Sequence, residues 1–367
     1  MTELASYYYF IFWFIVLILT MNKAIQLNNL GGYRALYQRD NDTPLVLFSI
    51  FFIVFWGFRP IAHVFGDTVN YYNSYENMFN TGMIEGSGVS ESDWLFTNFM
   101  FLCSQITSIN IFFTIVLFFY VVMMYSGCKK IDERHGMTLM LFCVGAYSFY
   151  TFSVNGIRNG VACSFVIMAI AGVCKGERVW PIILSFIAIG CHKSAALPLA
   201  CMFFTYFVRS PYFMYIAWLG AIVISLLFGE FIDNLLTLIS FDERLSEELI
   251  ENEADGLELS HSFRWDFLLY GSMPILLGAY TLFVRKVYNN TYLILLGTYI
   301  YANAFWIFAI RAIFSNRIAY LSWFLYPIVL AYPLFNLPVF KNNHSRITAL
   351  ILLAHYLFTT FMWLIGK

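Results

Sequence analysis

The sequence predicts an all-α, polytopic integral membrane protein with about twelve transmembrane helices. Of its 367 residues, 60% are hydrophobic and only 12% are charged, and the mean hydropathy is +0.70. Long apolar runs with few charges are typical of membrane spans, and a soluble core of this length needs far less apolar surface. We find no linker, low-complexity tract or internal repeat, so we expect a single integral domain, 1–367. The apolar runs cover residues 5–20, 44–65, 109–125, 137–152, 157–174, 180–191, 195–208, 212–229, 267–284, 292–310, 318–340 and 347–365.

Two of these runs decide the topology. Runs 180–191 and 195–208 are shorter than the roughly 20 residues that cross a bilayer, and only Cys191–Ser194 separates them. They form either two short spans that meet at a polar break or one interrupted helix. Counted as two spans, they place 13 of the 21 Lys and Arg residues in the inner segments. Inner loops are rich in basic residues, so we expect twelve spans with both termini outside.

The first run has no basic region before it and no small-residue cleavage pattern after it. We therefore expect it to be a retained span and not a signal peptide. The seven cysteines lie in apolar runs or at the inner edge, in a pattern that predicts neither a disulfide framework nor a zinc site.

Two segments on the predicted outer side lie outside the spans. Segment 66–108 is acidic and contains no Lys or Arg. Within it, 81–90 is Gly-rich and loop-like, while 94–106 is apolar but too short to cross, so we expect an interfacial or re-entrant helix there. Segment 230–266 is strongly acidic, which is typical of a solvated surface; the alternative is a lid or a negatively charged surface beside a site.

Five basic residues lie within or beside apolar runs on this outer side: Arg59, Arg158, Lys193, Arg311 and Arg317. A cation near the membrane centre costs about 3 kcal/mol on insertion scales, so each implies a partner or an anionic ligand. Arg158 follows a polar, Gly-rich break, and a helix is expected to begin at about Ile157. Free amide groups and a guanidinium would converge there on a phosphate. The alternative is that Arg158 snorkels or pairs with an acid.

The break at Cys191–Ser194 brings His192 and Lys193 together between two apolar helices. Both side chains can contact phosphate oxygens, and an imidazole can also move a proton at neutral pH. The alternative for His192 is an ordinary structural hydrogen bond. Arg311 and Arg317 flank a hinge, where the alternative is anchoring at the membrane edge. Arginines spaced around one cavity would suit a pyrophosphate.

Asp67, Tyr71 and Tyr75 recur every four residues, which places them on one face of a predicted helix with Glu76 beside them. A carboxylate beside aromatic rings is typical of sugar binding, and Asp67 could accept a proton from a hydroxyl group. The alternative is that Asp67 caps the helix and the tyrosines form an interfacial belt. The chain lacks a phosphate-binding loop, a His-Glu-x-x-His motif and a nucleophile elbow, which argues against ATP-driven transport and serine or zinc hydrolysis.

Taken in order, these motifs resemble the EpsG family of Wzy-like bacterial polysaccharide polymerases. The resemblance rests on Asp67 with its spaced tyrosines, Arg158 before a small-residue helix, His192 to Ala195, and Arg317 followed by Tyr320. It covers about residues 67–320, and the order and spacing of the motifs carry it.

The resemblance implies a membrane-embedded, lipid-donor glycosyltransferase with a GT-C-like architecture. Such an enzyme joins undecaprenyl-pyrophosphate-linked oligosaccharide repeat units of O-antigen, capsule or exopolysaccharide at the outer face of the bacterial inner (plasma) membrane. Inversion at the anomeric carbon, no metal and no cofactor are expected. The expected partners are the lipid-linked donor and acceptor, the bilayer, a chain-length regulator and a flippase, and no nucleic acid.

For such an enzyme we expect Arg158, Arg317 and Arg59 to bind the donor pyrophosphate, with smaller contributions from Arg311 and Lys193. Asp67 and His192 compete for the role of catalytic base. The acceptor glycan is expected to contact Tyr71, Tyr75 and Glu76. The alternative functions are a flippase or other transporter of lipid-linked oligosaccharides, which should show repeat halves and charges on both faces, and a sugar acyltransferase.

Overall fold

The computed structural model describes residues 2–84, 91–239, 263–311 and 315–365, and within these ranges helices are the regular secondary structure. The chain divides into two compact units. Unit 1 is Met1–Ala195 with Ala331–Lys367, and unit 2 is Ala196–Leu330. The prediction of an all-α polytopic membrane protein is confirmed, whereas the single integral domain stays a prediction.

The helices of unit 1 are α1 (Thr2–Asn29), α2 (Thr43–Gly57), α3 (Thr68–Thr81), α4 (Trp94–Ile106), α5 (Ile109–Ile131), α6 (Gly136–Val144), α7 (Tyr147–Val154), α8 (Ile157–Cys174), α9 (Val179–Cys191) and α17 (His344–Ile365), with the short turns η1 (Arg34–Leu36), η2 (His63–Phe65), η3 (Glu91–Asp93) and η4 (Lys193–Ala195). Those of unit 2 are α10 (Ala196–Phe207), α11 (Pro211–Ile239), α13 (Trp265–Ala279), η5 (Tyr280–Val284), α14 (Asn290–Phe308) and α15 (Ser315–Trp323), and α16 (Tyr326–Asn336) crosses the boundary.

Eight helical segments of the described chain are long and apolar enough to span a membrane. A ninth is added if α6 and α7, which meet at 72°, count as one bent span. The predicted count of about twelve is not supported, because three apolar runs form helices of only 15, 13 and 12 residues, namely α2, α9 and α10. At 1.5 Å per residue these reach about 22 Å or less, short of a roughly 30 Å hydrocarbon core.

The second run shows why hydropathy overestimates the spans. It continues in sequence to residue 65, but α2 ends at Gly57, shortly before Pro60. Proline has no N–H to donate and disfavours helical geometry in the preceding residue, so the helix stops even though the apolar composition continues.

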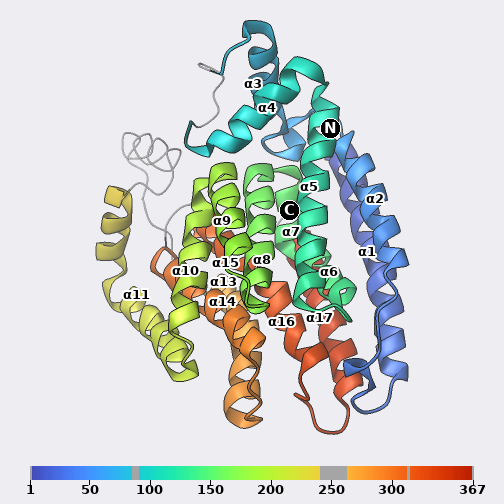
Figure 1. Ribbon diagram of the computed structural model, residues 1–367, viewed down its shortest axis with the longest axis vertical. Coiled ribbons are helices and arrows are strands. Elements are labelled where there is room, and N and C mark those ends of the chain that lie inside the picture. The colour runs from blue at the N-terminus through green and yellow to red at the C-terminus, as the bar shows by residue number, and fades with distance from the viewer. Residues whose placement is uncertain (1, 85–90, 240–262, 312–314, 366–367) are drawn as a thin grey trace. The chain divides into compact units, whose positions relative to one another are not determined.

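In unit 1, α1 and α17 lie side by side and antiparallel (Figure 1). The Tyr356 hydroxyl donates to the Trp13 carbonyl, and at the far end of both helices the Ser345 hydroxyl donates to the Gly32 carbonyl at 2.9 Å. The beginning of α1 and the end of α17 therefore lie at the same end of unit 1.

One end of unit 1 is held by ion pairs between helices and loops. Lys23 contacts Asp40 at 2.6 Å, and the Asp40 carboxylate also accepts hydrogen bonds from the Thr138 amide and hydroxyl. At the same end of the unit, Lys130 contacts Glu177 at 2.6 Å. We call this the basic end, because most basic residues of unit 1 lie here: Lys23, Arg34, Arg39, Lys129, Lys130, Arg134, Lys175, Arg178, Lys341 and Arg346.

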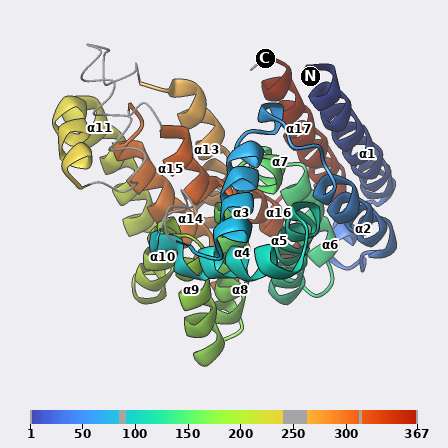
Figure 2. The same ribbon diagram turned by 90° about the horizontal axis from the view of Figure 1, so that it is seen from above.

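The opposite end of unit 1 carries α3 and α4 (Figure 1), and Figure 2 looks onto these two helices. Helix α4 lies against the C-terminal end of α9 and the N-terminal end of α5, so it covers that end of the unit. The bounds of α4, Trp94–Ile106, are those of the apolar stretch that we expected to form a non-spanning helix. We call this the covered end; it also contains the beginning of α8 at Ile157, as predicted.

Unit 2 is built around α14, which packs against α10, α11 and α15. Two of its hydrogen bonds between buried groups run from one helix to another. The Trp218 indole donates to the Asn303 side chain at 2.9 Å, and the Tyr299 hydroxyl donates to the Gly271 carbonyl at 2.7 Å. These bonds fix the helices of unit 2 against one another, because a buried polar group without a partner is costly.

Candidate functional site

At the covered end of unit 1, the buried carboxylate of Asp93 contacts several polar groups from other helices. Its side chain is 1% exposed. Its Oδ2 atom accepts a hydrogen bond from Arg158 Nη1 at 2.7 Å, and His192 Nδ1 lies 3.1 Å from both carboxylate oxygens. The Lys193 amide donates to Oδ1 at 3.0 Å. We call Asp93, Arg158, His192 and Tyr71 the Asp93 cluster; it joins η3, α8, the C-terminal end of α9 and α3.

The electrostatics of the cluster keep the Asp93 carboxyl ionised. Burial alone would raise its pKa, because a charged group loses its hydration. The hydrogen bond and charge of His192, together with the Arg158 guanidinium and the Lys193 amide, outweigh burial, and the Asp93 pKa lies below its ordinary value. The carboxylate is therefore a fixed negative charge that holds two cationic or polar side chains in place.

Arg158 lies in the first turn of α8 and is held from two sides. Its Nε donates to the Tyr71 hydroxyl at 3.2 Å, and its guanidinium carbon lies 5.9 Å from the centre of the Tyr71 ring. Its Nη2 makes no hydrogen bond with the described part of the chain, and the side chain is 13% exposed. Arg158 thus pairs with an acid, which was one of the two possibilities that the sequence left open. Its Nη2 donors remain available for a ligand.

His192 follows the last residue of α9 and is 19% exposed. Its Nδ1 faces Asp93, while Nε2 makes no hydrogen bond within the residues that the structure describes. Gly190 makes this approach possible, since a Cβ there would press on the Trp94 ring and the Leu95 side chain. The start of α4, and with it Asp93, can therefore lie directly against the end of α9.

Asp67 lies at the N-cap position of α3, but its side chain accepts a hydrogen bond from the Asn70 side-chain Nδ2 at 3.2 Å and makes no capping bond to the helix backbone. Its own backbone N–H donates to Asn155 Oδ1 at 2.9 Å. The Asn155 side chain occupies the place where a Cβ of Gly66 would lie, and Gly66 has a φ of +63°. Only glycine fits this turn, which joins the start of α3 to the break before α8.

The remaining predicted residues of α3 have different surroundings. The Tyr75 side chain is buried, and its hydroxyl donates to the Cys103 carbonyl at 2.8 Å and lies 3.0 Å from the Thr107 hydroxyl, so it joins α3 to α4. Glu76 is half-buried on the same helix. Tyr71 and Tyr75 lie on the buried face of α3, as their spacing predicts, and Tyr71 belongs to the Asp93 cluster.

Arg59 is 1% exposed and its guanidinium is occupied by the protein. It donates to Thr68 Oγ1, to the Trp56 carbonyl and to the Val154 carbonyl at 3.0–3.3 Å, and it lies 4.3 Å from the centre of the Phe113 ring. These contacts join the ends of α2 and α7 to the start of α3. In this arrangement Arg59 positions the segments that carry Asp67 and Tyr71.

Arg311 and Arg317 lie in unit 2. The guanidinium carbon of Arg311 is 5.9 Å from the centre of the Phe263 ring, and its Nε atom is buried without a hydrogen-bond partner in the described residues. Arg317 and Tyr320 lie on α15. The structure thus brings Arg158, His192, the Lys193 backbone and Tyr71 together in unit 1, and places the other two arginines in the second unit.

A family model described as the EpsG family matches residues 43–367. The chain belongs to the EpsG family. The known role of this family is that of Wzy-like polysaccharide polymerases, which agrees with the resemblance seen in the sequence. No curated protein and no solved structure matches the chain. The matched range begins at the start of α2, so it contains the whole Asp93 cluster together with Arg311 and Arg317.

Asp93 is the residue of this EpsG-family chain that sequence reasoning missed. It lies in an acidic segment without a cation, 65 residues before Arg158, and nothing near it in sequence distinguishes it from Glu85 or Glu91. The available signal was indirect: a buried Arg158 requires an acid, and the outer segment 66–108 is the nearest source of one.

Two sequence predictions concern residues outside the described part of the chain. Most of the acidic segment 230–266 falls there, because residues 240–262 are not described, and so does most of the Gly-rich stretch 81–90.

Within the described ranges, no three or more His, Cys, Asp or Glu side chains form a group that could hold a metal ion.

Proposed function

We propose that this EpsG-family chain is a membrane-embedded glycosyltransferase that joins undecaprenyl-pyrophosphate-linked oligosaccharide repeat units. The growing chain is the donor. A hydroxyl of the next lipid-linked unit attacks its anomeric carbon with inversion, and undecaprenyl pyrophosphate leaves. Because the leaving group carries negative charge and no metal takes part, protein cations must stabilise it in the transition state.

The observation that carries the proposal is the Asp93 cluster. A buried carboxylate holds Arg158 and His192 in fixed positions at one end of unit 1, with the Tyr71 ring and hydroxyl beside them. Arg158 uses two of its three nitrogens for this and keeps Nη2 available. A guanidinium oriented in this way can bind a phosphate oxygen without first losing side-chain freedom.

His192 is the better candidate for the base. With Nδ1–H directed at Asp93, the neutral ring presents the Nε2 lone pair to the acceptor hydroxyl, and Asp93 stabilises the imidazolium that forms. Asp67 is the second candidate, because its carboxylate also lies at the covered end, beside the break that precedes α8. Tyr71, Tyr75 and Glu76 follow Asp67 on helix α3. We assign Tyr71 and Glu76 to binding of the acceptor glycan.

Unit 2 supplies further cations in this proposal. Arg317 and Arg311 keep the pyrophosphate-binding role that the sequence predicts for them, and the Arg311 Nε–H, buried without a partner among the described residues, can donate a hydrogen bond to an anion. Lys193 contributes its backbone amide to Asp93 and a positive charge. Arg59 is assigned a positioning role, because its three nitrogens already bind the protein.

The distribution of charge within unit 1 supports an outward-facing site. The basic end carries most of the lysines and arginines, and the Asp93 cluster lies at the opposite, covered end. Because cytoplasmic loops of membrane proteins are rich in basic residues, the covered end faces the periplasm or the cell exterior of the bacterial plasma membrane.

A deletion strain separates polymerisation from export of lipid-linked sugars. We expect gels of its surface polysaccharide to show single repeat units on lipid, and plasmid-borne wild-type protein to restore long chains. Loss of all outer material would instead indicate a flippase and would refute the proposed function. An unchanged chain-length ladder would refute both functions.

A further inference from the structure

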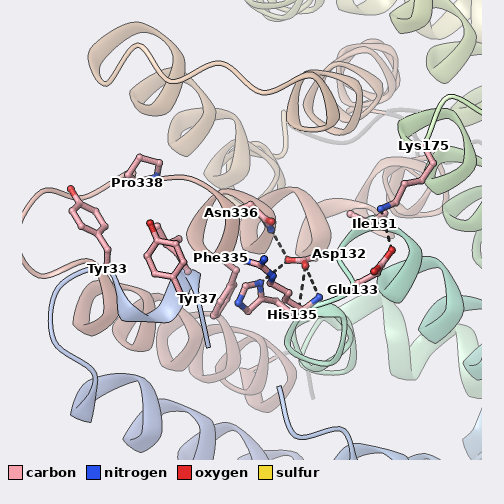
Figure 3. Close-up of a pocket in the computed structure, with 12 residues that line it drawn as sticks. Tyr33, Tyr37, Ile131, Asp132, Glu133, His135, Lys175, Phe335, Asn336 and Pro338 are labelled. Carbon is pink, nitrogen blue, oxygen red and sulfur yellow. Dashed lines mark hydrogen bonds and ion pairs between the residues drawn. The ribbon is translucent and has the colours of Figure 1, made fainter. Parts of the chain in front are cut away.

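A cavity of about 540 Å³ opens at the basic end of unit 1, away from the Asp93 cluster. Its lining comes from the turn after α1, the loop between α5 and α6, the start of the α8–α9 loop and the end of α16 (Figure 3). This volume lies within the roughly 300–1,000 Å³ that is usual for small-molecule sites. The proposed polymerase function uses none of its residues.

The wall of the cavity holds a second buried carboxylate with a histidine. Asp132 Oδ1 accepts hydrogen bonds from the Arg134 and His135 amides, and Oδ2 accepts from the Asn336 side chain at 2.7 Å and lies 2.9 Å from His135 Nδ1. Figure 3 shows His135 and Asn336 converging on Asp132. Burial tends to raise the Asp132 pKa, but the donors from His135 and Asn336 lower it below its ordinary value. The carboxylate is therefore charged and fully used by the protein.

His135 is left with an unsatisfied atom. Its side chain is 2% exposed, and Nε2 is buried without a hydrogen-bond partner in the described chain. With Nδ1 directed at Asp132, Nε2 is the ring nitrogen that still needs a hydrogen-bond partner. Because a buried polar group without a partner is costly, the cavity beside it should contain that partner.

The charges around the cavity indicate which kind of ligand fits it. Asp132 pairs with His135, and Glu133 pairs with Lys175 at 3.7 Å. This leaves Arg134, whose guanidinium makes no hydrogen bond or ion pair with the part of the chain that the structure describes, as an excess positive charge. An arginine guanidinium and a buried ring nitrogen without a partner, both lining one cavity, favour an oxyanion with several polar atoms.

We propose that this cavity is a second ligand site, which binds a phosphate group between His135 Nε2 and Arg134. The phosphate belongs either to the headgroup of an anionic lipid or to a soluble phosphate ester. Both sources carry the same acceptor oxygens, and both can reach a cavity at the end of a membrane-embedded unit. The Tyr33, Tyr37 and Phe335 rings also line the cavity and suit the less polar remainder of such a ligand.

The test is NMR spectroscopy of the full-length protein in nanodiscs, with its histidine rings labelled with ¹⁵N. The chain has six histidines, so their resonances can be assigned individually. The first arm titrates inorganic phosphate in neutral phosphatidylcholine discs, and the second replaces that lipid with phosphatidylglycerol. We expect one of the two additions to shift the His135 Nε2 resonance, which is assigned with His135→Gln. Phosphate alone indicates a soluble ester, and phosphatidylglycerol alone indicates a lipid headgroup.

Arg134→Gln should weaken the binding by about tenfold or more, since it removes the excess charge at an exposed side chain and leaves the buried Asp132 network in place. Arg39→Gln is the matched control, an exposed arginine of the same end that does not line the cavity, and should bind as wild type. If neither addition shifts His135, or if Arg134→Gln binds as tightly as Arg39→Gln, the proposal is refuted. Polymerase activity does not enter this result.

Discussion

At the scale of single residues, Asp93 determines the geometry of the candidate site. It is buried, it is ionised, and it is the common partner of Arg158 and His192. Removing one member of a buried ion pair leaves the other charge without compensation, which generally costs about 3–5 kcal/mol. Asp93 therefore contributes to stability and to the orientation of both functional side chains.

Replacing this carboxylate should destabilise the protein in detergent. We expect Asp93→Ala to lower the free energy of unfolding by about 3–5 kcal/mol and Asp93→Asn to lower it by less, because the amide oxygen still accepts one hydrogen bond. Thermal unfolding measures the difference. Glu133→Ala is the control, since that carboxylate is exposed and its 3.7 Å pair with Lys175 should contribute no more than about 1 kcal/mol.

The stabilisation by Asp93 should depend on pH in a defined direction. Its folded-state pKa is depressed, so its contribution is fully present above the unfolded value of about 3.9 and is lost as the pH falls through the lower folded value. The stability gap between wild type and Asp93→Asn should therefore be constant near neutral pH and shrink below about pH 4. A gap that widens in acid would contradict an ionised Asp93.

The choice of base can also be tested at this scale. If His192 takes the proton, His192→Gln should lower kcat by about 10²-fold or more and remove the acidic limb of the kcat/KM pH profile, because glutamine cannot accept a proton. Asp67→Asn should then keep that limb and affect KM more than kcat. The reverse pattern would assign the base to Asp67.

At the scale of elements, the pairing of α3 with α4 holds Asp93 over the ends of α8 and α9. The Tyr75 hydroxyl contacts the Cys103 carbonyl and Thr107, and Gln105 donates to the Met78 carbonyl at 3.0 Å, so bonds run between the two helices. Since α4 begins directly after Asp93, any loosening of this pair is expected to reach the cluster.

Tyr75→Phe should therefore loosen α4 without removing a charged group. Losing the hydroxyl leaves the Cys103 carbonyl with fewer donors and should cost about 1–3 kcal/mol. Hydrogen exchange measures the effect, and we expect faster exchange across Trp94–Ile106 than in wild type. Tyr72→Phe is the matched control on the same helix, with a half-buried side chain, and should leave α4 unchanged. Equal exchange in both variants would show that the Tyr75 bond does not hold α4.

The elements also show what a single sequence can predict. The non-spanning helix α4, the start of α8 and the polar break after α9 were predictable, because apolar composition changes sharply at Trp94, Ile157 and Cys191. The number of spans was not, because hydropathy does not register that α2, α9 and α10 are helices of only 15, 13 and 12 residues, nor the 72° bend between α6 and α7. The partner of Arg158 was not predictable either, because it depends on which of several acids the fold of α3 and α4 buries.

At the scale of the whole molecule, the account requires the covered end of unit 1 to face outward and the basic end to face the cytoplasm. Both predicted sites depend on it: the Asp93 cluster would meet lipid-linked sugars outside, and the cavity beside His135 would meet phosphate inside. Orientation is accessible to cysteine labelling, because the native cysteines are buried except for the half-buried Cys174.

In a Cys174→Ser background, Asn73→Cys on α3 and Arg39→Cys at the basic end introduce exposed thiols at the two ends. A membrane-impermeant maleimide added to intact spheroplasts should label Asn73→Cys and should label Arg39→Cys only after lysis, because the bilayer excludes the reagent. Labelling in the opposite order would place the Asp93 cluster on the cytoplasmic side.

The central claim is that Arg158, held by Asp93, binds the donor pyrophosphate of a polymerase. The most direct measurement is chain extension by the purified protein in nanodiscs with lipid-linked repeat units, comparing Arg158→Ala with Arg39→Ala. We predict that Arg158→Ala lowers kcat by about 10²–10³-fold, as expected for loss of a transition-state donor, that Arg158→Lys recovers part of it, and that Arg39→Ala is unchanged. Normal chain extension by a folded Arg158→Ala protein would contradict the account.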